Sequence, residues 1–119
     1  MTVDPWTALA VAAVGAFLAL RVMRGRKTPA DEVAKRIGAG AQIVDVRAPA
    51  EFRSGAYPGA INIPLQELGR RAGELATDRP VVVYCASGMR SASAARLLRH
   101  AGFAHVVNAG GLADMPRAP

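Results

Sequence analysis

The sequence predicts an α/β domain with a mainly parallel central sheet and helices on both faces, preceded by one N-terminal helix. Two observations predict the domain: short runs of β-branched residues alternate with amphipathic stretches, and glycine or proline separates them. The N-terminal helix is predicted by a long uncharged stretch near the start of the chain. The chain has 119 residues, of which 51% are hydrophobic, and this is enough for one domain with its own core.

The uncharged stretch favours a membrane anchor. Residues 5–20 carry no charge, Trp6 lies at one end, and four basic residues follow within 21–27. Aromatic and basic residues at the two ends of an apolar helix are typical of membrane interfaces. We therefore predict a transmembrane anchor with a basic juxtamembrane segment at 1–27 and the α/β domain at 28–119.

The basic residues also predict an orientation. By the positive-inside rule, the protein is predicted to be a single-pass membrane protein with the domain at 28–119 on the cytoplasmic side. The alternatives are a helix that lies on the membrane surface, a helix in water, and a secretory signal peptide. A signal peptide is disfavoured because its basic residues should precede the apolar stretch, whereas here they follow it.

The first half of the domain contains two predicted strands. Pro29 favours a helix start, a β-branched run predicts a buried strand, and Pro64 ends a second, shorter one. The predicted elements are a helix at 30–37, a strand at 42–46, a turn-rich connection at 51–59 and a strand at 60–63.

The second half repeats this alternation. Leucine spacing predicts an amphipathic helix, a valine run predicts a strand, and Gly102 is placed to end the helix that follows. The predicted elements are a helix at 65–75, a strand at 81–84, a helix at 91–101, a strand at 105–107 and a terminal turn from 110.

Composition excludes several classes of site. A single cysteine excludes an intrachain disulfide framework, and neither histidine has a carboxylate at ligand spacing, so we expect no bound metal and no cofactor. The net charge is +6, but the sequence shows no basic stripe with interleaved aromatic residues and no recognition helix. We therefore expect no nucleic-acid partner.

Cys85 is the residue that most clearly predicts chemistry. It ends a predicted strand, and a short glycine-containing loop and then a helix follow it. That order aims backbone N–H groups and the positive end of a helix at the sulfur, which favours the thiolate. A lone cysteine can also be an inert buried residue, but the polar loop after it favours a nucleophile. The residues of this loop predicted to bind substrate are Ala86, Ser87, Gly88, Met89, Arg90 and Ser91.

Charged residues follow the strand at 42–46 as well. In a parallel sheet, ligands bind beyond the carboxyl ends of the strands, so two neighbouring strands can bring these residues near Cys85. Such carboxylates and guanidinium groups more often brace loops than act in catalysis. We expect Asp45, Arg47 and Glu51 to support the site in this way.

The domain resembles the rhodanese family of sulfurtransferases in its single-domain form. The resemblance covers most of residues 29–115 and depends on the order and spacing of several motifs. These motifs lie at 43–47, 51–52, 55–64, 83–91 and 107–111.

The resemblance implies a ping-pong sulfur transfer. Cys85 takes a sulfur atom from a small anionic donor such as thiosulfate, and a thiol or cyanide acceptor removes it from the resulting persulfide. Arg90 is expected to orient the donor, since its guanidinium group offers a fork of N–H groups to an anion. The sequence departs from the family pattern at Ala86, where many members that use thiosulfate carry a basic residue.

Two other functions are open to such a chain. One is a cysteine-dependent phosphatase or arsenate reductase, but only four residues separate Cys85 from Arg90, one fewer than in the phosphatase loop. The other is a membrane-tethered binding module that keeps the fold without catalysis. The presence of both Cys85 and Arg90 favours the enzyme over the binding module.

Overall fold

The computed structural model describes residues 3–25 and 27–118, and the side chains of all of these except 20–25. The chain begins with one long helix, and the sheet and its helices follow. The elements in chain order are α1 (Pro5–Gly25), α2 (Ala30–Gly38), β1 (Gln42–Asp45), α3 (Pro49–Ser54), β2 (Ile61–Asn62), α4 (Leu65–Arg71), β3 (Val81–Cys85), α5 (Met89–His100) and β4 (Val106–Gly111), with short 3-10 helices at Ala72–Glu74 and Leu112–Asp114.

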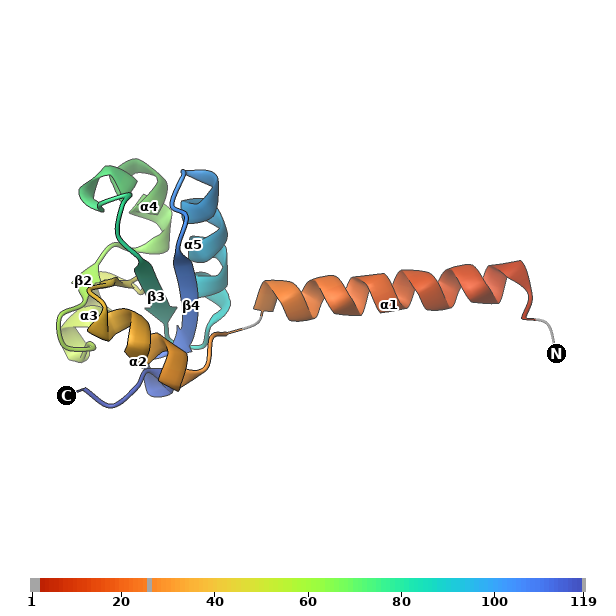
Figure 1. The fold of residues 1–119 in the computed structure, drawn as a ribbon, viewed down its shortest axis with the longest axis horizontal. Helices are drawn as coiled ribbons and strands as arrows, with labels where there is room; N and C mark the ends of the chain where they lie inside the picture. The colour runs from red at the N-terminus through yellow and green to blue at the C-terminus, as the bar shows by residue number, and fades with distance from the viewer. Residues whose placement is uncertain (1–2, 26, 119) are drawn as a thin grey trace.

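The four strands form one parallel sheet in the order β2-β1-β3-β4 (Figure 1). Each strand is joined to a parallel neighbour by a crossover that contains a helix, as short βαβ connections require. Helices α4 and α5 cover one face of the sheet and α2 covers the other. The predicted α/β class, with a mainly parallel sheet and helices on both faces, is confirmed.

Strand β3 is the centre of the core. All five of its residues are buried, as expected for a strand covered on both faces. Because successive side chains point to opposite faces, Val81, Val83 and Cys85 pack with α4 and α5, whereas Val82 and Tyr84 pack with α2. Cys85 therefore lies under α5, the helix that begins just after it.

Several predicted elements have different limits in the structure, and three of these differences bear on the site. Residues 49–54 form helix α3, whereas the sequence pattern predicted a turn-rich connection from Glu51. Pro49 occupies the first turn, where the missing N–H costs nothing, and the Glu51 side chain accepts a hydrogen bond from the Ala48 N–H. Helix α5 begins two residues earlier than predicted and β4 extends four residues further. Both changes lengthen the elements that surround Cys85.

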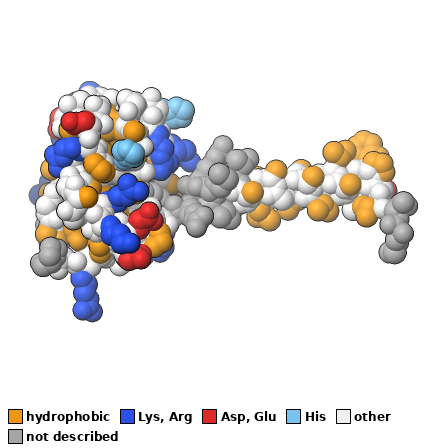
Figure 2. Space-filling view, viewed as in Figure 1, with side chains coloured by type: hydrophobic (Ala, Val, Ile, Leu, Met, Phe, Trp, Pro, Cys, Tyr) orange, Lys and Arg blue, Asp and Glu red, His pale blue; other side chains and the backbone are white. Residues whose placement is uncertain are grey.

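The N-terminal helix is present and projects away from the domain (Figure 1). The Asp4 carboxylate accepts hydrogen bonds from the N–H groups of Trp6 and Thr7 at 2.8 and 3.0 Å, which caps the first turn. Large apolar side chains along α1 are exposed, including Trp6 at 81% and Phe17 at 62% (Figure 2).

The prediction that this helix spans a membrane is wrong. Over the residues that the structure describes, no helix has the combination of length and apolar character that a membrane crossing requires. The uncharged stretch at 5–20 has only 16 residues, six of them alanine, whereas a spanning helix needs roughly 20 predominantly apolar residues. The predicted single-pass topology, with the catalytic domain on the cytoplasmic side, depended on that anchor and is withdrawn with it.

Candidate active site

The site is built where β3 passes into α5. Cys85 is the last residue of β3, and α5 begins at Met89, so three residues make the turn. Gly88 precedes the helix in a left-handed conformation with φ 99°. A side chain at Gly88 would strain this backbone, and glycine therefore allows the loop to close tightly around the sulfur.

Backbone N–H groups of this loop converge on the thiol. The Gly88 N–H donates to Cys85 Sγ at 2.9 Å, and Cys85 is fully buried. Burial raises the pKa of the Cys85 thiol, but hydrogen bonds from the Ser91 side chain and from the N–H groups of Ser91, Gly88 and Ser87 lower it. The net effect lowers the pKa, because the loop replaces the water that a buried thiolate loses.

The Ser91 hydroxyl links the sulfur to strand β4. Ser91 Oγ lies 3.4 Å from Cys85 Sγ and 2.6 Å from Asn108 Oδ1. The same Asn108 oxygen accepts a hydrogen bond from the Gly110 N–H at 2.9 Å. Cys85, Ser91 and Asn108 are all buried, so water does not screen these contacts.

A β-bulge at the end of β4 places these groups. Val83 pairs with Asn108 and Cys85 pairs with Gly111, so β4 contains one residue more than β3 between these two pairs. The bulge brings Gly111 against the loop, where an added Cβ atom would overlap the Ala86 carbonyl oxygen. Glycine at position 111 therefore permits the close approach of β4 to the Cys85 loop.

Arg90 forms a two-pronged ion pair with Glu51. Arg90 Nη1 lies 2.7 Å from Glu51 Oε1, and Nη2 lies 3.1 Å from Oε2. The side-chain hydrogen bonds from Arg90, helped by the Ala48 N–H, lower the pKa of Glu51 to about 2. The pair ties α3 to the start of α5 and holds the guanidinium group beside the loop.

Asp45 and Arg47 form a second ion pair, which is buried. Arg47 Nη2 lies 2.7 Å from Asp45 Oδ2 and also donates to the Gly55 carbonyl at 2.7 Å. Asp45 pairs in register with Tyr84, and the Arg47 guanidinium lies 5.7 Å from the Tyr84 ring centre. Among the described residues, no hydrogen bond or salt bridge joins either residue to the Cys85 loop. The pair braces the connection that follows β1.

The outer rim of the loop is largely apolar. Ala86, Ser87 and Met89 are exposed, and the Met89 side chain reaches 79% exposure.

Within residues 3–25 and 27–118, no group of three or more His, Cys, Asp or Glu side chains is arranged to hold a metal ion.

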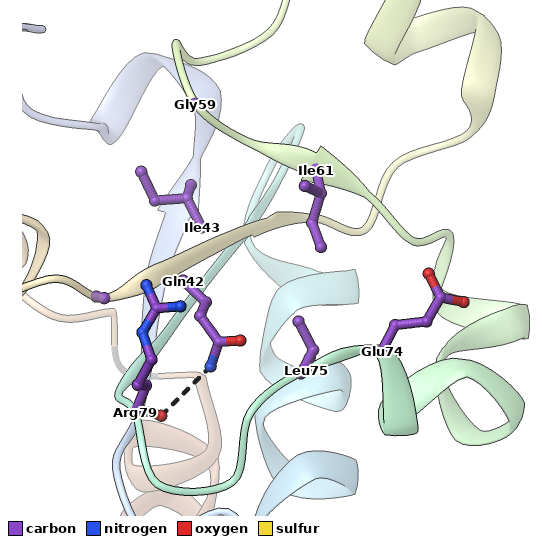
Figure 3. Close-up of a pocket in the computed structure, with 8 residues that line it drawn as sticks. Gln42, Ile43, Gly59, Ile61, Glu74, Leu75 and Arg79 are labelled. Atoms are coloured by element: carbon purple, nitrogen blue, oxygen red, sulfur yellow. Dashed lines mark hydrogen bonds between the residues drawn. The ribbon is translucent and has the colours of Figure 1, made fainter.

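A hollow of about 250 Å³ lies at the other end of the sheet (Figure 3). Gln42, Ile61 and Leu75 line it together with Arg79 and Glu74. Its polar side chains are already engaged, because Gln42 exchanges hydrogen bonds with the Ala76 backbone and Arg79 donates to the Gly40 carbonyl. Cys85 is not among the residues that line this hollow.

Two contacts near the thiol were not predicted from the sequence. Asn108 interrupts an otherwise apolar run in β4 while facing the same side as Cys85, and a polar residue in such a buried strand was the available signal. Lys27 lies 2.9 Å from Asp114, whose other oxygen accepts the Gly111 N–H. No sequence pattern indicated this second contact, because 87 residues separate its partners.

Comparison with known proteins identifies the family of this domain. The family model of the rhodanese-like domain matches residues 29–115. The chain belongs to the rhodanese-like family. Thiosulfate sulfurtransferase PspE of Escherichia coli is 42% identical over 74 residues, which cover 60% of this chain and 71% of that protein. The uncharacterized protein YqhL of Bacillus subtilis is 47% identical over 68 residues, or 57% of this chain and 54% of that protein. The match thus spans little more than half the length of YqhL.

Solved structures of rhodanese-like proteins share the fold. A rhodanese with anions from E. coli aligns with a TM-score of 0.61 at 41% identity, covering 65% of this chain and 95% of that one. The human single-domain sulfurtransferase TSTD1 aligns with a TM-score of 0.64 at 27% identity, covering 71% of this chain and 88% of that one. The sheet and the helices that flank it are therefore those of a rhodanese-like domain.

Proposed function

We propose that this rhodanese-like domain is a sulfurtransferase, with Cys85 as the nucleophile that carries sulfur as a persulfide. The observation that carries the proposal is the Gly88 N–H hydrogen bond to Cys85 Sγ at 2.9 Å inside a loop that ends at a helix N-terminus. The naming of PspE as a thiosulfate sulfurtransferase supports the same chemistry.

In the first half-reaction the Cys85 thiolate attacks the outer sulfur of a donor such as thiosulfate. An Sγ–S bond forms, the S–S bond of the donor breaks, and sulfite leaves with the electron pair of that bond. The outer sulfur of the new persulfide carries the negative charge. We expect the loop N–H groups, of which the Gly88 N–H already donates to Cys85 Sγ, to stabilise this anion as well.

In the second half-reaction the outer sulfur passes to an acceptor. A thiolate or cyanide ion attacks that sulfur, the Sγ–S bond breaks, and Cys85 returns as a thiolate. The same hydrogen bonds that lower the pKa of Cys85 make it a better leaving group. With one cysteine in the chain, the acceptor has to come from another molecule.

The geometry also favours a particular class of donor. Because Cys85 is 0% exposed, a small donor whose electrophilic atom is terminal suits this site better than a bulky one. The short loop, with four residues between Cys85 and Arg90, suits one sulfur atom better than a tetrahedral phosphate group. We therefore prefer sulfur transfer to phosphatase or arsenate reductase chemistry.

Mass spectrometry tests the proposal directly. The purified protein, incubated with thiosulfate and freed of excess donor, is expected to gain one sulfur atom on Cys85. Cyanide is then expected to remove that sulfur and yield an equal amount of thiocyanate. Cys85→Ser is the control, since a hydroxyl cannot carry the persulfide.

The kinetics give a second test. Varying donor and acceptor together is expected to give parallel double-reciprocal lines, because sulfite leaves before the acceptor reacts. Intersecting lines, or thiocyanate formation by Cys85→Ser at the wild-type rate, would show that Cys85 does not carry the sulfur.

A further inference from the structure

The Ser91 hydroxyl lies among four groups that can accept its proton. Its oxygen is 2.6 Å from Asn108 Oδ1 and 3.4 Å from Cys85 Sγ. The Gly88 and Gly110 carbonyl oxygens are also near, at 3.1 and 3.3 Å. A hydroxyl group has one proton, so Ser91 can donate to only one of these neighbours at a time.

The orientation of Asn108 decides where that proton lies when Cys85 is a thiol. The Gly110 N–H points at the Asn108 side-chain atom at 2.9 Å, so that atom has to be the carbonyl oxygen and not the NH₂ group. A carbonyl oxygen cannot donate, and Ser91 is therefore the donor across the 2.6 Å contact. The Ser91 oxygen then remains free to accept the Cys85 S–H.

When Cys85 is a thiolate, its sulfur accepts hydrogen bonds and no longer donates one. It has no proton to give and needs donors in place of the water that it has lost. The Ser91 hydrogen can turn toward Cys85 Sγ by rotation of the hydroxyl alone, without movement of any heavy atom. Asn108 Oδ1 then keeps only the hydrogen bond from the Gly110 N–H.

We propose that Asn108 is a positioning residue that competes with the Cys85 thiolate for the Ser91 proton. Ser91 donates to Asn108 while the sulfur is a thiol or a persulfide, and it donates to Cys85 Sγ when the sulfur is a thiolate. The proposal rests on the proposed role of Cys85 as the nucleophile. Through Ser91, Asn108 would limit how strongly the thiolate is stabilised, both as nucleophile and as leaving group.

The other charged groups around the sulfur stay constant in the test. Arg90 faces Cys85 from α5 and is paired with Glu51, and Asp114 with Lys27 lies beyond the Gly111 end of β4. Asp45 and Arg47 form the neighbouring pair after β1. Substitutions at Asn108 and Ser91 remove none of these charges, so a difference between the shifts in the two Ser91 backgrounds reports on the Ser91 contacts.

The rate of Cys85 alkylation by iodoacetamide, measured across pH, tests the proposal. Cys85 is the only cysteine, so the midpoint of the profile belongs to it. Asn108→Asp keeps the shape and both acceptor contacts but pulls harder on the Ser91 proton. We expect the midpoint to rise by about one pH unit in this variant. In a Ser91→Ala background, the same substitution is expected to shift the midpoint by less than half as much.

Two outcomes would overturn the proposal. An equal shift in both backgrounds would mean that the new carboxylate acts through space alone, and no shift in Asn108→Asp would mean that Asn108 does not compete. Asn108→Leu gives the opposite test, because loss of the acceptor should lower the midpoint. If Asn108→Leu does not fold, the comparison of Asn108→Asp in the two backgrounds still decides.

Alkylation needs no sulfur donor, which separates this proposal from the proposed function. A protein that never forms thiocyanate but shows the Ser91-dependent shift would refute sulfur transfer and leave the hydrogen-bond competition in place. A protein that transfers sulfur at the normal rate without the shift would refute the competition alone.

Discussion

The two ends of the sheet differ in what their polar groups contact. At the amino end, a hollow of about 250 Å³ is lined by polar side chains that already have backbone partners, since Gln42 bonds with Ala76 and Arg79 with Gly40. At the carboxyl end, the N–H groups of a short loop converge on one sulfur atom that can change its charge. A hollow is therefore a weaker sign of a site than the direction in which the donors point.

Topology explains the difference. Strand β3 of the parallel sheet runs into a loop and the N-terminus of α5, where N–H groups lack partners within the helix. At the opposite end, chain segments arrive from helix C-termini, and their carbonyl groups are bound by side chains such as Arg79. The carboxyl end of the sheet thus has backbone N–H groups that can donate to a ligand, whereas at the amino end the side-chain donors are already bonded to backbone carbonyl groups.

The largest effect is expected where β4 presses on the Cys85 loop. In Gly111→Ala, the added Cβ overlaps the Ala86 carbonyl oxygen, which belongs to the same planar peptide unit as the Ser87 N–H. Tilting that unit turns the N–H away from the sulfur. We expect a loss of about 2 kcal/mol in the free energy of unfolding and about a 100-fold fall in kcat/KM, measured by urea unfolding and thiocyanate formation.

Gly73→Ala is the matched control for that substitution. An added Cβ at Gly73 meets no atom within 4 Å, so it tests the cost of alanine for glycine without a clash. We expect little change in either measurement. A similar loss in both variants would show that the close approach of Gly111 to Ala86 is not what shapes the loop.

The next largest effect is expected at the ion pair beside the thiol. Arg90→Ala removes a cation and leaves the Glu51 carboxylate unpaired near the entering donor. We expect the KM for thiosulfate to rise about tenfold, since a charge-assisted contact to an anion is lost. Steady-state kinetics with saturating cyanide measure this value.

Glu51→Gln separates the two causes. If the unpaired carboxylate repels the anionic donor, the double variant Arg90→Ala/Glu51→Gln should have a lower KM for thiosulfate than Arg90→Ala alone. An unchanged KM in Arg90→Ala would mean that Arg90 only holds α3 against α5.

Much of this fold was predictable because strand patterns are local. The run 42–46 and the run 81–84 each predicted a strand, and β1 and β3 lie there. Helix α3 was missed because its six residues carry no apolar periodicity, and its start depends on Pro49 and on a Glu51 contact that shows only in three dimensions. The membrane anchor was wrong because anchor-like ends at Trp6 and Arg21 outweighed the shortness of the stretch between them.

The site was predictable only along one stretch of chain. Cys85 and the loop after it are contiguous, so their order alone indicated converging N–H groups. Asn108 lies 17 residues from Ser91, and its contact depends on a bulge that no periodicity announces. Glu51 and Arg90 were both noted as charged candidates, but their pairing across 39 residues needed the fold.

A smaller effect is expected in acid. Because the Arg90 hydrogen bonds lower the pKa of Glu51 to about 2, the pair stabilises the fold above the ordinary glutamate pKa, and that contribution is lost as pH falls toward 2. Urea unfolding at about pH 6 and about pH 3 is expected to show a larger fall in stability for the wild type than for Glu51→Gln. Equal falls in the two proteins would mean that the pair adds nothing to stability.

The smallest effect on activity is expected at the amino end. Arg79 donates to the Gly40 carbonyl at 3.2 and 2.7 Å through Nε and Nη2, and its side chain is exposed. Arg79→Ala is expected to lower the free energy of unfolding by about 0.5–1 kcal/mol, as for an exposed hydrogen-bonded charge. We expect kcat/KM for sulfur transfer to stay within about twofold of the wild type, because no group that contacts Cys85 is altered. A tenfold fall in kcat/KM without a matching loss of stability would show that the hollow takes part in sulfur transfer. The contrast between the two ends of the sheet would then have to be abandoned.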